Sequence, residues 1–170
     1  MTNYIIASTR DLYKPVIDQL KWQYSDANFI YIDKYEDLTS ETLSKYNPRY
    51  IFLPQWSKFI PPEIFIKYEC ILFHMADLPN GRRGGPLQDL ISHGIFETKL
   101  TAFKCTEKMD SGPVYMKVPF TLYGSAEEIL LRARSVVKKI ITAIIETNPI
   151  PTEQLGGGNF FKHRSEQDSD

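Results

Sequence analysis

A histidine closes an apolar segment immediately before a loop rich in glycine and arginine. The apolar residues 70–73 end on His74, and the following loop contains Arg82 and Arg83. Imidazole exchanges protons readily near neutral pH and serves as a general acid or base. This position indicates that His74 acts in proton transfer. The alternative is a structural histidine, which is the more frequent role of a lone one.

Asp110 is the second candidate for a chemical role. It lies in the polar segment 106–113, after an expected strand and shortly before Gly112. A carboxylate in that place can orient an imidazole or balance its positive charge. The alternative is an aspartate that only caps its own turn with the following glycine.

Arg82 and Arg83 lie in a glycine-rich turn, residues 81–85, which is followed by Pro86. Backbone amides and guanidinium groups in such a turn can bind a phosphate, and proline is suited to the first turn of a helix. The turn is neither a Walker loop nor the dinucleotide-binding fingerprint. It predicts an anion pocket, with a plain basic turn as the alternative.

The sequence does not support other kinds of site. His74 and Asp77 are close in the chain, but no second histidine or cysteine cluster stands at metal-ligand spacing, so no metal is expected. No serine or cysteine occupies a nucleophile elbow. Cys70 and Cys105 both lie in apolar segments, which indicates buried thiols in a reducing compartment.

Short strands and helices alternate along the chain, which favours an α/β fold with a mostly parallel sheet and helices on both faces. Ligands of such sheets bind beyond the carboxyl ends of the strands, which is where His74 is expected. Residues 100–105 and 114–120 are expected to pair as antiparallel strands around the loop of Asp110. The other expected elements are strands at residues 4–7, 29–32, 50–53 and 70–73, helices at residues 38–46 and 63–68, and a helix with Val16, Ile17 and Leu20 on its inner face.

The longest helix is expected after Ser125. Residues 125–128 have the Ser-x-x-Glu form of a capping box. The apolar positions that follow keep helical spacing, and the charged residues between them are expected to form a solvated face. The apolar positions are Ile129, Ala133, Val136, Val137, Ile140, Ile141 and Ile144, and the charged ones are Arg132, Arg134, Lys138 and Lys139.

The composition is that of one globular domain. The 170 residues carry a formal charge of −1, from 20 basic and 21 acidic residues, so no net field would attract nucleic acid or an anionic membrane. No apolar run approaches the ~18 residues that span a bilayer, and no signal peptide is apparent, which predicts a cytoplasmic protein. The expected domain is residues 1–150, followed by a partly flexible extension, residues 151–170. Residues 159–164 of this extension are expected to add an edge strand or a partner contact, and the aromatic tail around Phe160 and Phe161 to form a homodimer contact or to fold back on the sheet.

Several motifs together resemble the 10-formyltetrahydrofolate-dependent formyltransferases. They are His74 with Pro79, the glycine and arginine turn, the segment 86–88, and the Asp-x-Gly-x-Val element that starts at Asp110. The resemblance runs from about Asn3 to the end of the long helix. Within the family, residues 74–82 and 124–128 resemble the N-formyltransferases of nucleotide-linked amino sugars, in particular the type found in pseudaminic-acid pathways.

The resemblance implies a Rossmann-like domain that moves a formyl group from 10-formyltetrahydrofolate to the amine of a nucleotide-linked amino sugar, such as a UDP-4-amino-4,6-dideoxy sugar. It implies catalytic roles for His74 and Asp110, and no metal. The residues that it matches to folate binding are Trp56, Ser57 and Phe59 in one loop and Glu107, Lys108 and Met109 in another. Those that it matches to the phosphates of the substrate are Ser8, Thr9, Arg10, Arg82 and Arg83.

The chain departs from the family pattern at Leu72, where the family has a catalytic asparagine two residues before the histidine. Loss of one such oxyanion donor costs about 2.7–4 kcal/mol of transition-state stabilisation when nothing replaces it. Gln55, a backbone N–H or water could take over, or the protein could only bind folate or a nucleotide sugar. An unrelated α/β nucleotide-binding domain is the other alternative. Many family members carry a further domain after the long helix, where this sequence has a short tail, which argues against a tRNA substrate, as does the balanced charge.

Overall fold

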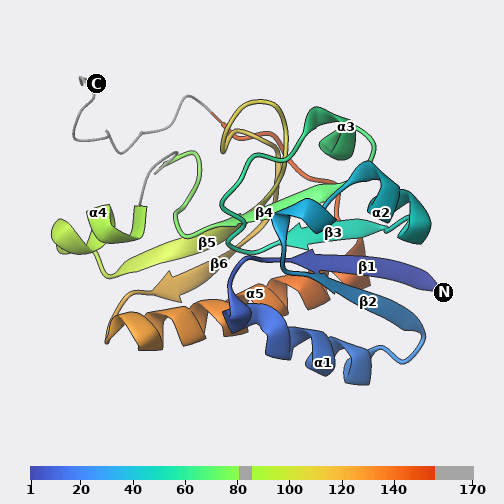
Figure 1. Cartoon of the computed structure of the whole chain (residues 1–170). Coiled ribbons are helices and arrows are strands. Elements are labelled where there is room, and N and C mark those ends of the chain that lie inside the picture. Colours follow the sequence, from blue (N-terminus) through green and yellow to red (C-terminus); the bar gives the residue numbers. More distant parts are fainter. Residues whose placement is uncertain (81–85, 156–170) are drawn as a thin grey trace. The chain divides into compact units, whose positions relative to one another are not determined.

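The computed structural model describes residues 1–80 and 86–155, which form an α/β fold around a single mixed sheet (Figure 1). The six strands follow the order β2-β1-β3-β4-β5-β6. The chain divides between Phe73 and His74 into two compact units, each described by itself below. The mostly parallel α/β sheet and the antiparallel pair near its C-terminal end are confirmed.

The first unit is built on parallel strands. β1 pairs with β2 and β3, and β3 pairs with β4, all in parallel register, and the residues of β3 are buried. Helix α1 packs beside β2 and buries Val16, Ile17 and Leu20, as its spacing predicted. The elements are β1 (Thr2–Ala7), the 3₁₀ turn η1 (Asp11–Tyr13), α1 (Lys14–Gln23), β2 (Ala27–Ile32), η2 (Tyr35–Asp37), α2 (Ser40–Tyr46), β3 (Tyr50–Leu53), α3 (Pro62–Phe65) and β4 (Cys70–His74).

The second unit is built on an antiparallel pair covered by the long helix. β5 (Glu97–Lys104) and β6 (Val114–Thr121) pair from Glu97 opposite Thr121 to Phe103 opposite Val114. α4 (Pro86–Ser92) precedes them, and α5 (Ala126–Thr147) packs on both strands. The capping box is confirmed, because the Ser125 hydroxyl accepts from the Glu128 N–H and the Glu128 carboxylate accepts from the Ser125 N–H. The seven apolar positions predicted for α5 are its buried face.

Several sequence predictions differ from the structure in detail. The strand expected at residues 100–105 is Glu97–Lys104, so Cys105 lies just after it. The helix expected at residues 63–68 is α3 at Pro62–Phe65, and the residues after it form a turn, which keeps one bond of helical spacing from the Tyr68 N–H to the Ile64 carbonyl, before β4 begins at Cys70. Arg132 is not a purely solvated charge. Its Nη1 donates to the carbonyl of Thr121 at 2.8 Å and to that of Tyr123 at 3.0 Å, so the second turn of α5 is tied to the end of β6 and to the segment that follows it.

Cys70 and Cys105 are buried thiols rather than disulfide partners, which confirms the sequence prediction. Burial raises the pKa of the Cys105 thiol to about 11, so this thiol is protonated and weakly nucleophilic near neutral pH. Within residues 1–80 and 86–155, no helix has the length and apolar character needed to cross a bilayer.

Candidate functional site

His74 is the last residue of β4 and is half-buried. Its ring stands edge-on to the ring of Phe103 on β5, with centroids 6.5 Å apart and planes at 89°. Phe103 is buried, so one side of the imidazole packs against an aromatic ring that the core holds in place. A half-buried histidine on a strand end and beside a rigid neighbour is a suitable general acid or base.

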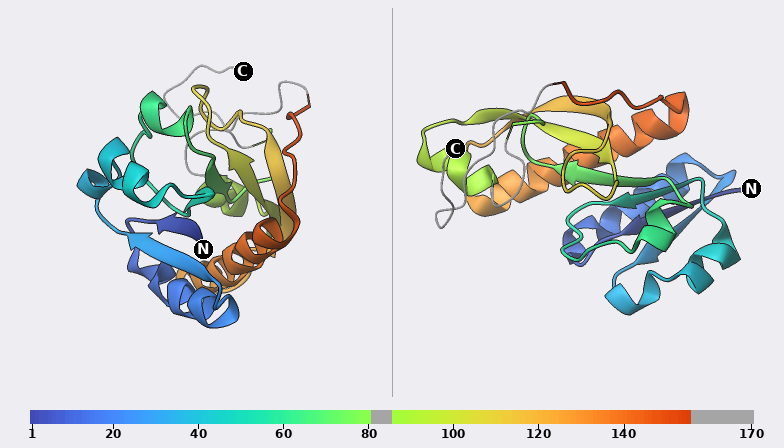
Figure 2. Two further views of the ribbon diagram at one scale, coloured as in Figure 1. Left: turned by 90° about the vertical axis from the view of Figure 1, so that its right-hand side faces the viewer. Right: turned by 90° about the horizontal axis from the view of Figure 1, so that it is seen from above.

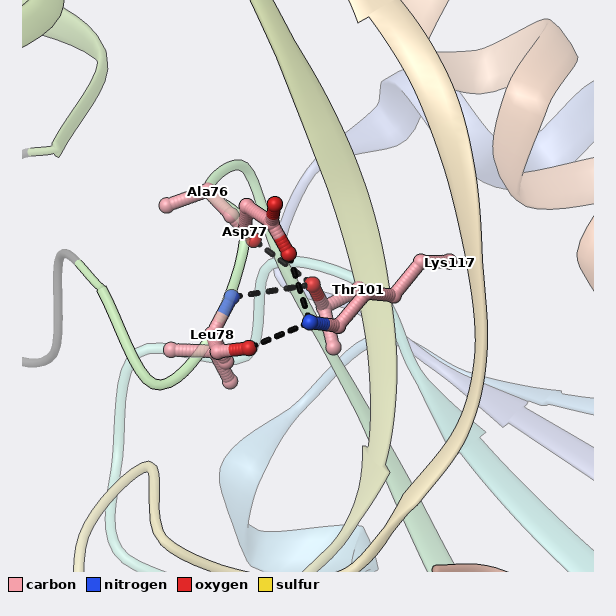
Figure 3. A network of polar contacts seen from close by, with 5 residues as sticks. All are labelled: Ala76, Asp77, Leu78, Thr101 and Lys117. Atoms are coloured by element: carbon pink, nitrogen blue, oxygen red, sulfur yellow. Dashed lines mark hydrogen bonds and ion pairs between the residues drawn. The ribbon is translucent and has the colours of Figure 1, made fainter. Parts of the chain in front are cut away.

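A network of polar contacts fixes the chain immediately after His74 (Figure 3). The fully buried Thr101 hydroxyl on β5 donates to the Ala76 carbonyl at 2.6 Å and accepts from the Leu78 N–H at 3.3 Å. Lys117 on β6 reaches the same segment, where its Nζ donates to the Asp77 carboxylate at 2.5 Å and to the Leu78 carbonyl. The segment that follows His74 is therefore pinned to both antiparallel strands.

We expect Thr101→Val to lower the free energy of unfolding by about 1–2 kcal/mol, because buried backbone groups of Ala76 and Leu78 lose their side-chain partner. The loss stays modest, since the Leu78 N–H also donates to the Ala76 carbonyl at 3.1 Å. Urea denaturation measures the change. Thr101→Ser keeps the hydroxyl and is the matched control, and an equal loss in both variants would assign the effect to packing instead.

Asp110 lies in the loop between β5 and β6, is half-buried, and has a left-handed backbone with φ of 53°. Its carbonyl accepts a hydrogen bond from Nε2 of Gln154 at 3.0 Å, and the same Nε2 donates to the Gly112 carbonyl at 2.8 Å. Gln154 belongs to the segment after α5, which runs beside β6 (Figure 2) and pairs Thr152 with Val114. Part of the predicted extension thus holds the loop that carries Asp110.

The glycine of the Asp-x-Gly element, Gly112, is required for a steric reason. A Cβ atom at this position would lie 1.7 Å from the carbonyl oxygen of Lys104, so no larger residue fits without moving the backbone. The close approach accompanies the hydrogen bond from the Lys104 N–H to the Pro113 carbonyl at 2.8 Å. The loop around Asp110 consequently folds back tightly onto the end of β5.

In the first unit, the turn after β1 contacts the loop after β3. The Thr9 hydroxyl donates to the Gln55 carbonyl at 3.2 Å. Ser8 is fully buried, and its hydroxyl accepts from the Arg10 N–H at 3.2 Å, so it shapes the turn. Arg10 is exposed. Thr9 therefore links the segment matched to substrate phosphates with the segment matched to folate.

Two residues of the loop after β3, Trp56 and Lys58, contact the ring of Tyr35 in η2. The rings of Trp56 and Tyr35 meet edge to face, with centroids 5.1 Å apart, and Nζ of Lys58 lies 4.5 Å from the Tyr35 ring centre. Ser57 and the Tyr35 hydroxyl share a hydrogen bond. Phe59 extends from the same loop and is 86% exposed. An aromatic side chain this exposed is costly in water and is suited to covering a flat ligand.

The second predicted folate loop is a tight turn in the second unit. Glu107, Lys108 and Met109 are exposed. The Lys108 carbonyl accepts from the Thr106 hydroxyl and the Ser111 N–H, both at 3.3 Å, and the Met109 carbonyl accepts from the Ser111 hydroxyl at 3.0 Å. These local bonds fix the backbone of the turn and leave its side chains outward.

Three of the sequence predictions lie outside the described residues. They are the anion pocket of residues 81–85 with Arg82 and Arg83, the edge strand at residues 159–164, and the homodimer contact at Phe160 and Phe161. In the part of the chain that the structure describes, no group of three or more histidine, cysteine, aspartate or glutamate side chains could hold a metal ion. The catalytic pairing of His74 with Asp110, which belong to the same compact unit, stays a prediction.

Sequence reasoning missed Thr101, Lys117 and Gln154, which hold the segments next to His74 and Asp110. Thr101 leaves one signal, since it is a polar residue within the apolar run from Leu100 to Phe103. A buried hydroxyl of this kind needs partners, and a strand ladder uses only backbone groups. The sequence carries no comparable signal for Lys117 or Gln154.

Comparison with known proteins finds solved structures that are similar to this chain over almost its whole length. One of them is a methionyl-tRNA formyltransferase from Clostridium thermocellum, 38% identical with a TM-score of 0.91, and the match covers 97% of this chain and 74% of that one. No family model matches. A curated methionyl-tRNA formyltransferase from Caldicellulosiruptor saccharolyticus is 27% identical over 121 residues, or 67% of this chain. This chain spans only about two fifths (39%) of the length of that relative.

A more distant structure was solved with ligands. It is the formyltransferase PseJ from Anoxybacillus kamchatkensis in complex with UDP-4,6-dideoxy-4-formamido-L-AltNAc and tetrahydrofolate. It is 15% identical, with a TM-score of 0.71, over 93% of this chain and 84% of that one. At this identity the likeness shows a shared fold.

Proposed function

Because this chain belongs to the formyltransferase family, we propose that it transfers a formyl group from 10-formyltetrahydrofolate to the primary amine of a nucleotide-linked amino sugar. The observation that supports formyl transfer most is the 38% identity to a formyltransferase over 97% of the chain. Family membership rules out an unrelated α/β nucleotide-binding domain. The reaction, its substrates and the roles of single residues are the proposal.

An amino sugar is proposed over tRNA because of charge. The formal charge of the chain is −1, whereas proteins that bind nucleic acid depend on many lysine and arginine contacts to phosphate. The UDP-linked formamido sugar bound to PseJ suggests the class of acceptor, a UDP-4-amino-4,6-dideoxy sugar of the pseudaminic-acid type. Methionyl-tRNA is the second candidate, since it is the substrate in the names of the more similar relatives.

The exposed aromatic loop fits a flat pterin. Phe59 is 86% exposed and Trp56 half-buried, so both present ring surface that a stacked ligand would cover. Ser57 and the turn at residues 107–109 would add polar contacts. Ser8 and Thr9 shape the turn where Arg10, an exposed cation, would meet a phosphate of the acceptor. The co-substrate itself supplies the activated formyl group on N10.

The chemistry requires one proton transfer and no redox step. The unprotonated amine attacks the formyl carbon, a new C–N bond forms, and the bond from that carbon to N10 breaks. His74 accepts the proton from the amine and passes it on to N10 of the departing tetrahydrofolate. As an imidazolium, His74 also stabilises the negative charge that develops on the formyl oxygen, and Asp110 orients the ring and balances its charge.

Mass spectrometry of candidate acceptors tests the proposal. With 10-formyltetrahydrofolate present, we expect the mass of one formyl group to be added to a UDP-4-amino-4,6-dideoxy sugar. The 4-hydroxy sugar is the matched control and should remain unchanged. Formylation of methionyl-tRNA alone would contradict the amino-sugar substrate but keep formyl transfer. Saturable binding without any product would favour a protein that only binds its ligands.

A further inference from the structure

We propose that Gln154 is a positioning residue, whose carboxamide fixes the backbone of Asp110 and so directs the Asp110 carboxylate. This inference rests on the proposed function, since Asp110 affects turnover only if the protein transfers formyl groups. Gln154 and Asp110 lie 44 positions apart in the chain and belong to the same compact unit. The segment after α5 thus forms part of the site, although it lies beyond the long helix.

The peptide group that joins Asp110 to Ser111 is held at both ends. Its carbonyl accepts from Nε2 of Gln154 at 3.0 Å, and its N–H donates to the Lys108 carbonyl at 3.3 Å. A peptide group is planar, so hydrogen bonds on its two opposite sides fix the plane. The orientation of this plane sets ψ of Asp110, and with it the direction in which the side chain leaves the backbone.

The backbone of Asp110 has a conformation that benefits from such support. Its φ of 53° lies in the left-handed region, which most side chains disfavour and aspartate tolerates. Nε2 of Gln154 also donates to the Gly112 carbonyl at 2.8 Å, so one carboxamide spans the two carbonyls on either side of Ser111. Because both partners are acceptors, only the NH₂ end of the carboxamide can face them, and its two protons serve one carbonyl each.

The segment that carries Gln154 is itself anchored beside β6 (Figure 2). Thr152 and Val114 exchange two hydrogen bonds, from the Val114 N–H to the Thr152 carbonyl at 2.7 Å and from the Thr152 N–H to the Val114 carbonyl at 2.8 Å. Gln154 follows this bridge by two residues and is only partly exposed. A side chain on a fixed backbone loses less conformational entropy when it binds the loop, so Gln154 is a firm support.

The base of the loop is closed by contacts that do not involve Gln154. The Lys104 N–H donates to the Pro113 carbonyl at 2.8 Å, and Gly112 packs directly against the Lys104 carbonyl. These contacts remain when the carboxamide is removed. We therefore expect its loss to change where the Asp110 carboxylate points, and not whether the loop folds.

Gln154→Met tests the inference, because methionine has a similar length and no donor. We expect kcat to fall by roughly 10–100-fold, since a misplacement of about 1 Å near the reacting atoms can cost 10²-fold. The Kd for tetrahydrofolate should change less than about threefold, because the carboxylate acts on the reaction step. Glu153→Met is the matched control, since Glu153 is the exposed neighbour in the same segment, and it should keep the wild-type kcat.

A double-mutant cycle with Asp110→Asn separates positioning from a general structural effect. In the Asp110→Asn background, Gln154→Met should lower kcat by less than about threefold further, because the group that it positions is already gone. The fall in Tm caused by Gln154→Met should be equal in both backgrounds, since both keep the backbone carbonyls that Gln154 binds.

Amide hydrogen exchange of Ser111 gives a readout that is independent of activity. Its N–H belongs to the peptide group whose carbonyl Gln154 holds. We expect this N–H to exchange at least about tenfold faster in Gln154→Met, because exchange reports local opening of the backbone. The Glu153→Met control should leave the exchange rate unchanged.

Three outcomes would overturn the inference. They are a wild-type kcat in Gln154→Met, an equal fold-loss of kcat in the two backgrounds, and unchanged exchange at Ser111. Each of these results leaves formyl transfer intact. Absence of transfer by the wild-type protein would overturn the proposed function and this inference together.

Discussion

Replacement of His74 by glutamine is expected to lower kcat for formyl transfer by roughly 10²–10⁴-fold, the range for loss of a general acid or base. Glutamine keeps a polar side chain of similar reach at the end of β4 but cannot accept the proton of the amine. Steady-state kinetics measure the loss, and circular dichroism verifies the fold. His93→Gln is the matched control, because His93 is exposed and lies just after α4.

A kcat within about tenfold of wild type in His74→Gln, with the fold intact, would contradict proton transfer by His74, because such a loss is below the usual contribution of a general base. The reaction would then depend on binding and orientation of the two substrates alone. The contact of the imidazole with Phe103 would in that case be purely structural.

Asp110→Asn is expected to lower kcat by roughly 10²–10³-fold, because the variant removes a preorganised charge next to the reaction. Asparagine accepts the left-handed backbone that Asp110 has, at φ of 53°, so stability should change little. The loss should be similar at saturating concentrations of both substrates, since the carboxylate acts on the reaction step. Initial rates at saturation measure it.

Asp18→Asn, on the exposed side of α1, is the control for a general effect of removing one negative charge. If Asp110→Asn and Asp18→Asn were equally active, Asp110 would be a turn residue without a role in the reaction. Asp110 would then contribute only to the structure of its loop, whose backbone accepts hydrogen bonds from Gln154.

Local sequence patterns predicted the elements whose stability is local. The capping box and the spacing of apolar residues placed α5 and its buried face, since both are properties of one helix. Both ends of β3 were predicted to the residue, because Pro48 and Pro54 on either side of the apolar run leave few positions at which the strand can begin or end. The helix at residues 63–68 was predicted too long. The chain must leave the helix early enough to enter β4 at Cys70, and this tertiary requirement outweighs the helix propensity of residues 66–68.

The contacts around the candidate site could not be read from the sequence, because they join residues far apart in the chain. Thr101 reaches Ala76 across 25 positions, Lys117 reaches Asp77 across 40, and Gln154 reaches Asp110 across 44. No local pattern marks such partners. The left-handed backbone of Gln55 is also unmarked, since glutamine is not a residue that favours a positive φ.

The most direct test of formyl transfer follows the formyl carbon itself. The protein would be incubated with 10-[¹³C]formyltetrahydrofolate and a UDP-4-amino-4,6-dideoxy sugar, and the label followed by NMR. We predict that a ¹³C-formamide signal of the sugar appears as tetrahydrofolate is released in equal amount, and that His74→Gln loses this signal. Release of labelled formate with no formamide, or no release at all, would contradict transfer to the amine.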